Sequence, residues 1–404
     1  MKVVQINETC GTGSIGRTTA EMAIELERRG NECVVAYASG DPNYNNVVKI
    51  GTDFDHKVHA ILSRVFGTQG YFSLRATRKF INKLEDIGPD VVHLRNLHSN
   101  YINLQLLFNY LAEKNIATVI TLHDCWVFTG KCTYYVPANC KKWQKSCGNC
   151  PLKYKDTVNP TFFFDRSNKC LSDKKKWLDQ IPRLAVVGVS KWVTNEASKS
   201  ILADRKPVVI YNWIDMDIFK PKESCLRKRH DLSSKFVILM VSSNISKKKG
   251  YNVMIELSRS LSDVYQIVVV GKNRNNLEIP DNVIHIPHTN DANQLAEYYS
   301  MADVCVNTTK YETFGKVTAE ALCCGTPVIV YNNTASPELV GENCGYVVEN
   351  NDIEGIIFAL EKIKSDGKKH YSQNCITFAR KNFNKDKAID SYLDIYNELI
   401  KVKR

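Results

Sequence analysis

Residues 304–330 decide the fold of the second half of the chain. Residues 304–307 read VCVN, residues 311–322 read YETFGKVTAEAL, and residues 325–330 read GTPVIV. The first and last runs are short and apolar, which is typical of buried strands, and the middle stretch predicts a helix beginning near Gly315. A strand, a helix and a second strand in this order predict a parallel β-α-β unit.

The same alternation extends in both directions from this unit. In the second half the apolar runs predict strands at 236–241, 266–270, 283–286, 304–307, 328–330 and 346–348. In the first half they predict strands at 3–6, 33–37, 91–94, 118–122, 184–189 and 208–211, with helices between them such as 17–29 and 104–114. The sequence therefore predicts an α/β protein with two doubly wound, Rossmann-like domains.

The join between the two domains is expected near residues 213–235, where Pro221 and a run of charged residues interrupt the periodic pattern. We assign residues 1–216 to the first domain and residues 217–386 to the second. A final helix at about 387–400 carries its apolar residues largely on one face. Because such a face must be covered, residues 387–404 are expected to pack back on the first domain.

The composition is that of a globular protein. The 404 residues are 44% hydrophobic and 24% charged, which is enough apolar material for two cores. The first seven residues run into a strand without the pattern of a signal peptide, and the sequence contains no run of 18 apolar residues. A cytoplasmic protein is therefore expected. The net charge of +11 favours nucleic acid, an anionic membrane surface or phosphorylated substrates as partners.

Two acidic residues flank the start of the helix near Gly315. Glu312 lies in the loop before it and Glu320 lies within it, with seven residues between them. An extended loop followed by about one and a half helical turns can place the two carboxylates at opposite ends of one elongated ligand. The helix N-terminal amides between them carry a partial positive charge, which suits a diphosphate.

Here the chain resembles the retaining glycosyltransferases of family 4, which have the GT-B architecture of two Rossmann-like domains facing across a cleft. Glu312 and Glu320 match their E-x7-E signature, and the GTPVI at 325–329 is also typical. The resemblance implies that Glu312 binds donor-sugar hydroxyls and Glu320 binds the nucleotide ribose, with Phe314, Gly315 and Lys316 in the same site. It also implies that the second domain binds the nucleotide sugar and the first forms the acceptor side.

A lysine run follows the first strand of the second domain. Lys247, Lys248 and Lys249 precede Gly250, and ammonium groups at a strand end can neutralise a donor diphosphate. In the family this loop usually carries an Arg and then a Lys-Gly pair. Lys249 matches the pair, but Asn244 stands where the Arg is common, so Lys248 or Lys247 is expected to supply the second charge. A solvated lysine run is the alternative.

A glycine-rich loop, GTGSIG at 11–16, follows the first strand of the chain. It also fits a dinucleotide fingerprint, which expects an acid at the end of the second strand. Asp41 comes too late for that role, which argues against a dehydrogenase. The family resemblance implies instead that Gly13, Ser14 and Gly16 lie against the donor phosphates and the acceptor.

Two histidines follow other strands of the first domain. A histidine at a strand end can contact a reacting sugar, and a neighbouring aspartate can orient its ring. In the family a histidine in the position of His123 faces the donor sugar, so His123, Glu312 and Lys249 form the expected catalytic set. His98 and Asp124 are expected on the acceptor side. A purely structural role is the alternative for both histidines.

The cysteines are concentrated after His123. Five of the fourteen fall within residues 125–150. Cys132, Cys140, Cys147 and Cys150 supply four thiolates, including a C-x2-C pair, and we hypothesise a structural zinc that fixes this insertion. Buried thiols or disulfides are the alternatives. The His-Asp-x-Trp at 123–126 and the cysteine-rich stretch also resemble bacterial glycosyltransferases of polysaccharide assembly.

The expected reaction is transfer from a UDP- or GDP-sugar to a saccharide or lipid-linked saccharide, with retention and without a cofactor for catalysis. The basic, amphipathic stretch at 57–83 suggests peripheral contact with anionic lipid at the inner membrane face, against an ordinary solvated helix face. Two further alternatives stay open at this point. One is a nucleotide-sugar epimerase of the same fold, and the other is a basic, zinc-containing protein that binds nucleic acid, a partner that the glycosyltransferase does not need.

Overall fold

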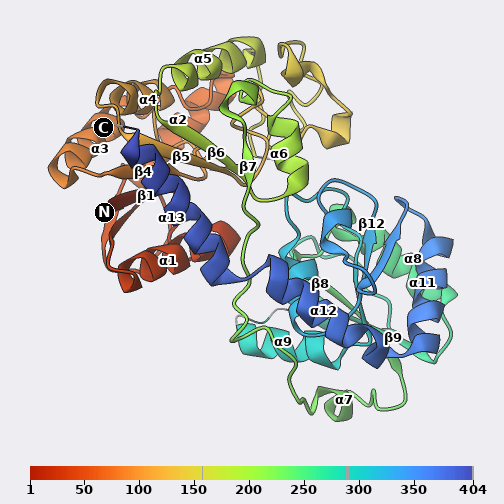
Figure 1. Cartoon of the computed structure of the whole chain (residues 1–404). Coiled ribbons are helices and arrows are strands. Elements are labelled where there is room, and N and C mark those ends of the chain that lie inside the picture. The colour runs from red at the N-terminus through yellow and green to blue at the C-terminus, as the bar shows by residue number, and fades with distance from the viewer. Residues whose placement is uncertain (157, 288, 290, 403–404) are drawn as a thin grey trace. The chain divides into compact units, whose positions relative to one another are not determined.

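The computed structural model describes residues 1–402 except 157, 288 and 290. The chain forms two compact units (Figure 1). The first unit comprises Met1–Ile210 together with Ile389–Arg404, and the second comprises Tyr211–Ala388. Each unit contains a parallel sheet with helices packed on it, as the alternating sequence pattern predicts.

The sheet of the first unit has the order β3-β2-β1-β4-β5-β6-β7 within the described residues. Its strands are β1 (Lys2–Ile6), β2 (Glu32–Tyr37), β3 (Val47–Lys49), β4 (Val91–Leu94), β5 (Ala117–Leu122), β6 (Leu184–Gly188) and β7 (Val208–Val209). Its helices are α1 (Gly13–Arg28), α2 (Asp53–Phe66), α3 (Leu74–Ile87), α4 (Leu104–Glu113), α5 (Ser167–Asp179) and α6 (Lys191–Ala197). The strand order reverses between β1 and β4, which is where doubly wound sheets bind ligands.

The last helix, α13 (Lys385–Lys401), lies for most of its length in the first unit. Its Tyr396 hydroxyl is 2.6 Å from Nδ1 of His93, and its Tyr392 hydroxyl is 2.9 Å from Oγ1 of Thr121. His93 and Thr121 lie on β4 and β5 and are themselves joined at 2.7 Å. The tyrosines thus add a second hydrogen bond to each of these two buried polar side chains.

The sheet of the second unit has the order β10-β9-β8-β11-β12-β13 in the part of the chain that is described. Its strands are β8 (Phe236–Asn244), β9 (Tyr265–Lys272), β10 (Val283–Ile286), β11 (Val304–Asn307), β12 (Val328–Tyr331) and β13 (Gly345–Val348). The helices are α7 (Leu226–Arg229), α8 (Tyr251–Ser260), α9 (Ala292–Met301), α10 (Lys316–Cys323), α11 (Ile353–Asp366) and α12 (Lys368–Asn382). Here the order reverses between β8 and β11.

The structure confirms the strands predicted from the apolar runs, with ends displaced by up to three residues. The strand β3 was not predicted, because it has only three residues and none of them is buried. Leaving out residues 157, 288, 290, 403 and 404, we find no helix whose length and apolar content would let it span a bilayer.

Candidate active site

In the second unit, Lys249 and Glu312 meet where β8 and β11 end. The ammonium of Lys249 donates to Oε1 of Glu312 at 2.7 Å, and their side chains are 38% and 20% exposed. The close packing of Gly250 fixes this turn, because a Cβ there would lie 2.5 Å from Oγ1 of Thr308. The first acid of the E-x7-E signature and the lysine of the Lys-Gly pair are therefore one ion pair.

The helix α10 begins at the same edge of the sheet. Gly315 precedes it with φ +95°, in the left-handed region that residues with a Cβ adopt only at a cost. Asn307, the last residue of β11, donates from Nδ2 to Oγ1 of Thr318 at 3.0 Å and ties the helix to the strand. The amides of the first turn, starting with Lys316, carry a partial positive charge.

Glu320 is oriented by a residue that the sequence pattern did not reveal. The hydroxyl of Tyr299 on α9 donates to Oε2 of Glu320 at 3.0 Å. Burial raises the pKa of Tyr299 well above its usual value, and the nearby Glu320 carboxylate raises it further. Tyr299 therefore stays protonated and remains a donor. No spacing rule links a helix residue to an acid on the next helix, which is why it was missed.

The other predicted donor-site residues have mixed environments. Phe314 is 3% exposed, and its ring packs against Tyr211 and Phe383 at centroid distances of 6.2 and 5.5 Å. Its side chain belongs to the core, so only its backbone is available to a donor. The ammonium of Lys248 lies 5.9 Å from the centroid of the Tyr311 ring.

Asn244, which stands where the family loop usually carries an Arg, connects the ends of two neighbouring strands. Its Oδ1 accepts a hydrogen bond from the backbone N–H of Arg274 at 3.1 Å. Arg274 is exposed and follows β9, the neighbour of β8 in the sheet. A further cation therefore stands at the same edge as Lys248 and Lys249, and the linear sequence gave no indication of this.

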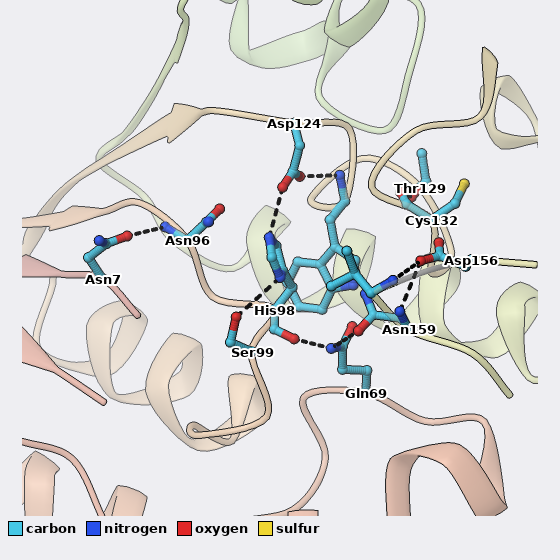
Figure 2. Close-up of polar contacts among 12 residues, drawn as sticks. Asn7, Gln69, Asn96, His98, Ser99, Asp124, Thr129, Cys132, Asp156 and Asn159 are labelled. Atoms are coloured by element: carbon cyan, nitrogen blue, oxygen red, sulfur yellow. Dashed lines mark hydrogen bonds and ion pairs between the residues drawn. The ribbon is translucent and has the colours of Figure 1, made fainter. Parts of the chain in front are cut away.

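In the first unit, His98 and Asp124 form a buried pair (Figure 2). Nε2 of His98 is 2.8 Å from Oδ2 of Asp124, and the side chains are 9% and 13% exposed. Oδ1 of Asp124 accepts from the backbone N–H of Trp126 at 2.8 Å. His98 follows β4 and Asp124 follows β5, so the parallel register brings them together.

The pair shifts both pKa values. Burial disfavours a charged imidazole, but the Asp124 carboxylate outweighs burial and the pKa of His98 is raised. Burial likewise disfavours the Asp124 carboxylate, and the His98 ring with the Trp126 amide outweighs it and lowers the pKa of Asp124. Each group therefore favours the charged form of the other.

Further polar contacts lie at the carboxyl ends of β1 and β4, on the same edge of the sheet as His98 and Asp124. Oδ1 of Asn7 accepts from the backbone N–H of Asn96 at 3.1 Å (Figure 2). The glycine loop closes through a bond from the Gly11 N–H to the Gly16 carbonyl at 2.8 Å. Gly16 must be small, because a Cβ would lie 2.4 Å from Oγ1 of Thr9.

The remaining loop residues and His123 lie at strand ends as the sequence predicts. Gly13 opens α1 with φ +68°, and Ser14 beside it is exposed. His123 directly follows β5 and is 8% exposed. The donor-side residues belong to the second unit and these residues to the first, and the role of each of them stays a prediction.

The four cysteines of the insertion line one cavity of about 20 Å³. Burial raises the pKa of Cys132 to about 12 and that of Cys147 to about 11. All fourteen cysteines, each of them in the described part of the chain, are free thiols. Among the described residues, no group of three or more His, Cys, Asp or Glu side chains is arranged to hold a metal ion. The structural zinc at Cys132, Cys140, Cys147 and Cys150 stays a prediction.

A buried lysine fixes the turn after Asp124. The ammonium of Lys174 on α5 donates to the carbonyls of Trp126 and Thr129 at 2.5 and 2.9 Å and lies 3.7 Å from the Trp126 ring centroid. Burial lowers the pKa of Lys174 to about 8. No sequence pattern distinguishes Lys174, because it lies among other lysines in a basic helix.

Two family models match the chain and together cover most of it. The model described as Glycosyltransferase Family 4 matches residues 15–218, and the one described as Glycosyl transferases group 1 matches residues 224–382. A putative colanic acid biosynthesis glycosyl transferase of Escherichia coli K12 is 23% identical over 375 residues, which are 87% of this chain and 88% of that protein. An N-acetyl-alpha-D-glucosaminyl L-malate synthase of Bacillus anthracis is 26% identical over 54% of this chain and 60% of its own length.

Solved structures share the fold over the whole chain. Sucrose-phosphate synthase from Thermosynechococcus elongatus has a TM-score of 0.72 at 16% identity, covering 99% of both chains. A glycosyltransferase from Rickettsia africae has a TM-score of 0.70 at 18% identity, covering 99% of this chain and 98% of that one. HepE of Anabaena, solved in complex with UDP-glucose, has a TM-score of 0.65 at 14% identity, covering 100% and 99%.

Proposed function

The chain belongs to Glycosyltransferase Family 4, and on that premise we propose that it transfers a sugar from a nucleotide-diphosphate donor with retention of configuration. The acceptor is a saccharide or lipid-linked saccharide in the assembly of a polysaccharide. The similarity to a putative colanic acid biosynthesis enzyme supports a role in polysaccharide biosynthesis. The UDP and UDP-glucose bound by HepE support a UDP-sugar as the first donor to test.

The observation that carries the proposal is the cluster of Lys249, Glu312 and the first turn of α10 at one edge of the sheet. In this proposal the diphosphate lies against the α10 amides and Lys249, with Lys248 or Arg274 as the second cation. Glu320, held by Tyr299, receives the ribose hydroxyls. A ligand bound this way follows the general rule that open parallel sheets bind at their switch point.

In the absence of a donor, Lys249 and Glu312 pair with each other, and in this proposal each binds a different part of the donor: Lys249 the phosphates and Glu312 the sugar. When a donor enters, its phosphates draw the ammonium of Lys249, and Glu312 becomes free to accept hydrogen bonds from sugar hydroxyls. A partly exposed pair of this kind contributes only about 0.2–1 kcal/mol. Exchanging it for contacts with the donor therefore costs little.

The proposed chemistry breaks the bond between the anomeric carbon and the phosphate oxygen, and the electron pair leaves with the nucleoside diphosphate. The acceptor oxygen attacks the same face, and its proton passes to the departing phosphate oxygen. Lys249 and the helix amides stabilise the charge that develops on this phosphate. His123, which follows β5, is proposed to contribute to catalysis, and His98 with Asp124 to binding of the acceptor.

The test is a panel of nucleotide sugars with saccharide acceptors, with the product linkage read by NMR. We expect transfer from at least one donor, an α-linked product from an α-linked donor, and loss of transfer in Glu320→Gln. Glu354→Gln on the first turn of α11 is the matched control and should be fully active. An inverted linkage would refute retention, and an epimerised donor formed without acceptor would identify an epimerase instead.

A further inference from the structure

Aromatic side chains gather on the surface of the first unit around the end of α2. Phe66 stacks on Phe164 with ring centroids 6.4 Å apart and planes inclined by 5°. The backbone N–H of Phe162 donates to the carbonyl of Arg64 at 2.9 Å, so residues 162–164 are held against the helix end. Phe163, between them, is 66% exposed. We call Phe66, Phe162, Phe163 and Phe164 the aromatic patch.

The helix that ends in this patch turns an apolar stripe to solvent. Phe54, Val58 and Ile61 lie at positions i, i+4 and i+7 and are 74%, 37% and 59% exposed. The opposite side, with His59 and Ser63, is buried instead. A surface helix normally turns its apolar stripe to the core, and large exposed apolar surfaces mark interaction sites.

Two cationic side chains contact the aromatic patch. Arg166 lies over the Phe164 ring at 5.8 Å, and Lys153 donates to the Phe163 carbonyl at 2.9 Å. Lys57 and Lys155 are exposed on α2 and on the loop. The nearby carboxylate of Asp165 is occupied by the backbone N–H groups of Cys150 and Ser167. Two cations therefore contact the aromatic patch, and the exposed Lys57 and Lys155 belong to the same two segments, whereas the acids of α2, Asp53 and Asp55, lie in its first turn at the other end of the helix.

We propose that the aromatic patch and the α2 stripe dock on a membrane that contains anionic lipid. Exposed Phe side chains beside Lys and Arg are the composition of segments that lie in the bilayer interface, where rings enter the acyl boundary and cations meet headgroup phosphates. The net charge of +11 adds long-range attraction to such a surface. This docking deepens the proposed function, on which it rests only for the identity of the acceptor.

The docking surface is connected to the acceptor-side pair within the first unit. Nε2 of Gln69 donates to the His98 carbonyl and to Oδ1 of Asn159 (Figure 2). Asn159 in turn donates its backbone N–H to Asp156 at 2.9 Å, in the loop that leads to Phe162. The same polar network thus holds both His98 and the aromatic loop. A lipid-linked acceptor anchored in the docked membrane would be presented next to His98.

The test is flotation of the full chain with phosphatidylcholine vesicles that contain or lack phosphatidylglycerol. We expect binding only to the anionic vesicles, and about tenfold weaker binding for Phe163→Ser, because one inserted aromatic ring is worth about a factor of ten. Phe358→Ser is the matched control, since Phe358 is 60% exposed on α11 and also lies near a lysine, Lys362, at 5.7 Å. Lys57→Glu combined with Lys155→Glu should weaken binding and reduce its dependence on salt.

Failure of wild-type chain to float with anionic vesicles would overturn the docking proposal, as would equal binding by Phe163→Ser. Equal weakening by Phe358→Ser would also overturn it, because binding would not be specific to the patch. Transfer to a short, lipid-free acceptor separates the two proposals. Phe163→Ser should retain that activity, whereas a wild-type chain that binds vesicles but transfers no sugar refutes only the proposed function.

Discussion

Replacing Asp124 by Asn tests the buried pair most directly. The substitution keeps the acceptor for the Trp126 N–H but removes the charge opposite His98. At pH 7 the variant should lose a charge-assisted hydrogen bond, and with it about 1.5–3 kcal/mol of unfolding free energy. Burial is then the largest influence on the pKa of His98 and lowers it, so the ring should stay neutral in the folded state, as burial lowers the pKa of His59 to about 3.

The difference in unfolding free energy between wild type and Asp124→Asn should depend on pH, in a direction that the pKa of His98 determines. In the wild type the raised pKa of His98 supplies stability that is fully present below the unfolded value near 6.5 and is lost as the pH rises through the folded value. In Asp124→Asn the folded pKa lies below the unfolded one, so stability falls as the pH drops below about 6.5. The difference between the two proteins should therefore widen by up to about 1.4 kcal/mol for each pH unit below 6.5.

The assay is urea unfolding of both proteins at pH 5, 6, 7 and 8. Other titrating groups, including His59, are shared and cancel in the difference. A second variant, His98→Gln combined with Asp124→Asn, is the control, because no imidazole is left to titrate at position 98 and its stability difference from the wild type should not widen below pH 6.5. A stability difference that stays constant from pH 5 to 8 would refute the assignment of a charged His98.

Three further experiments address the donor site and the cysteine insertion. Lys249→Ala should lower kcat for sugar transfer by about 100-fold through loss of leaving-group stabilisation, whereas an unchanged kcat would exclude this role. Tyr299→Phe should raise KM for the nucleotide sugar several-fold with little change in kcat, since it removes the hydrogen bond by which the Tyr299 hydroxyl orients the Glu320 carboxylate; a pure kcat effect would contradict that reasoning. Protein purified without chelator should contain about one zinc per chain, lost in Cys147→Ser, and active protein without stoichiometric metal would eliminate the zinc hypothesis.

Site residues in a local motif could be predicted from the sequence, whereas contacts between residues far apart in the chain could not. Glu312 and Glu320 were found from their spacing, because a loop and a helix start have fixed local geometry. Their partners Lys249 and Tyr299 come from other strands and helices, and the sequence suggested only Lys249, through the family resemblance. The pairing of His98 with Asp124 depends on the register of β4 against β5.

On the surface of the first unit, too, the local pattern could be predicted and the long-range contacts could not. The amphipathic character of residues 57–83 was visible, and part of it is the exposed stripe of α2. That this helix ends against Phe162–Phe164, about a hundred residues further along the chain, was not visible. The spacing of the four cysteines suggested a common zinc site; the four residues line one cavity, and the zinc site itself stays a prediction.

The sequence by itself determined the two parallel α/β units, their strands apart from the short β3, and the position of the acidic motif, because apolar periodicity and helix-start signals act over a few residues. Only the tertiary structure decided which side chains meet, as with Tyr299 and Glu320, Asp124 and His98, and Phe66 and Phe164. The physical reason is that strand order and register carry residues far apart in the chain to one edge of a sheet. Packing then selects among partners that no local pattern distinguishes.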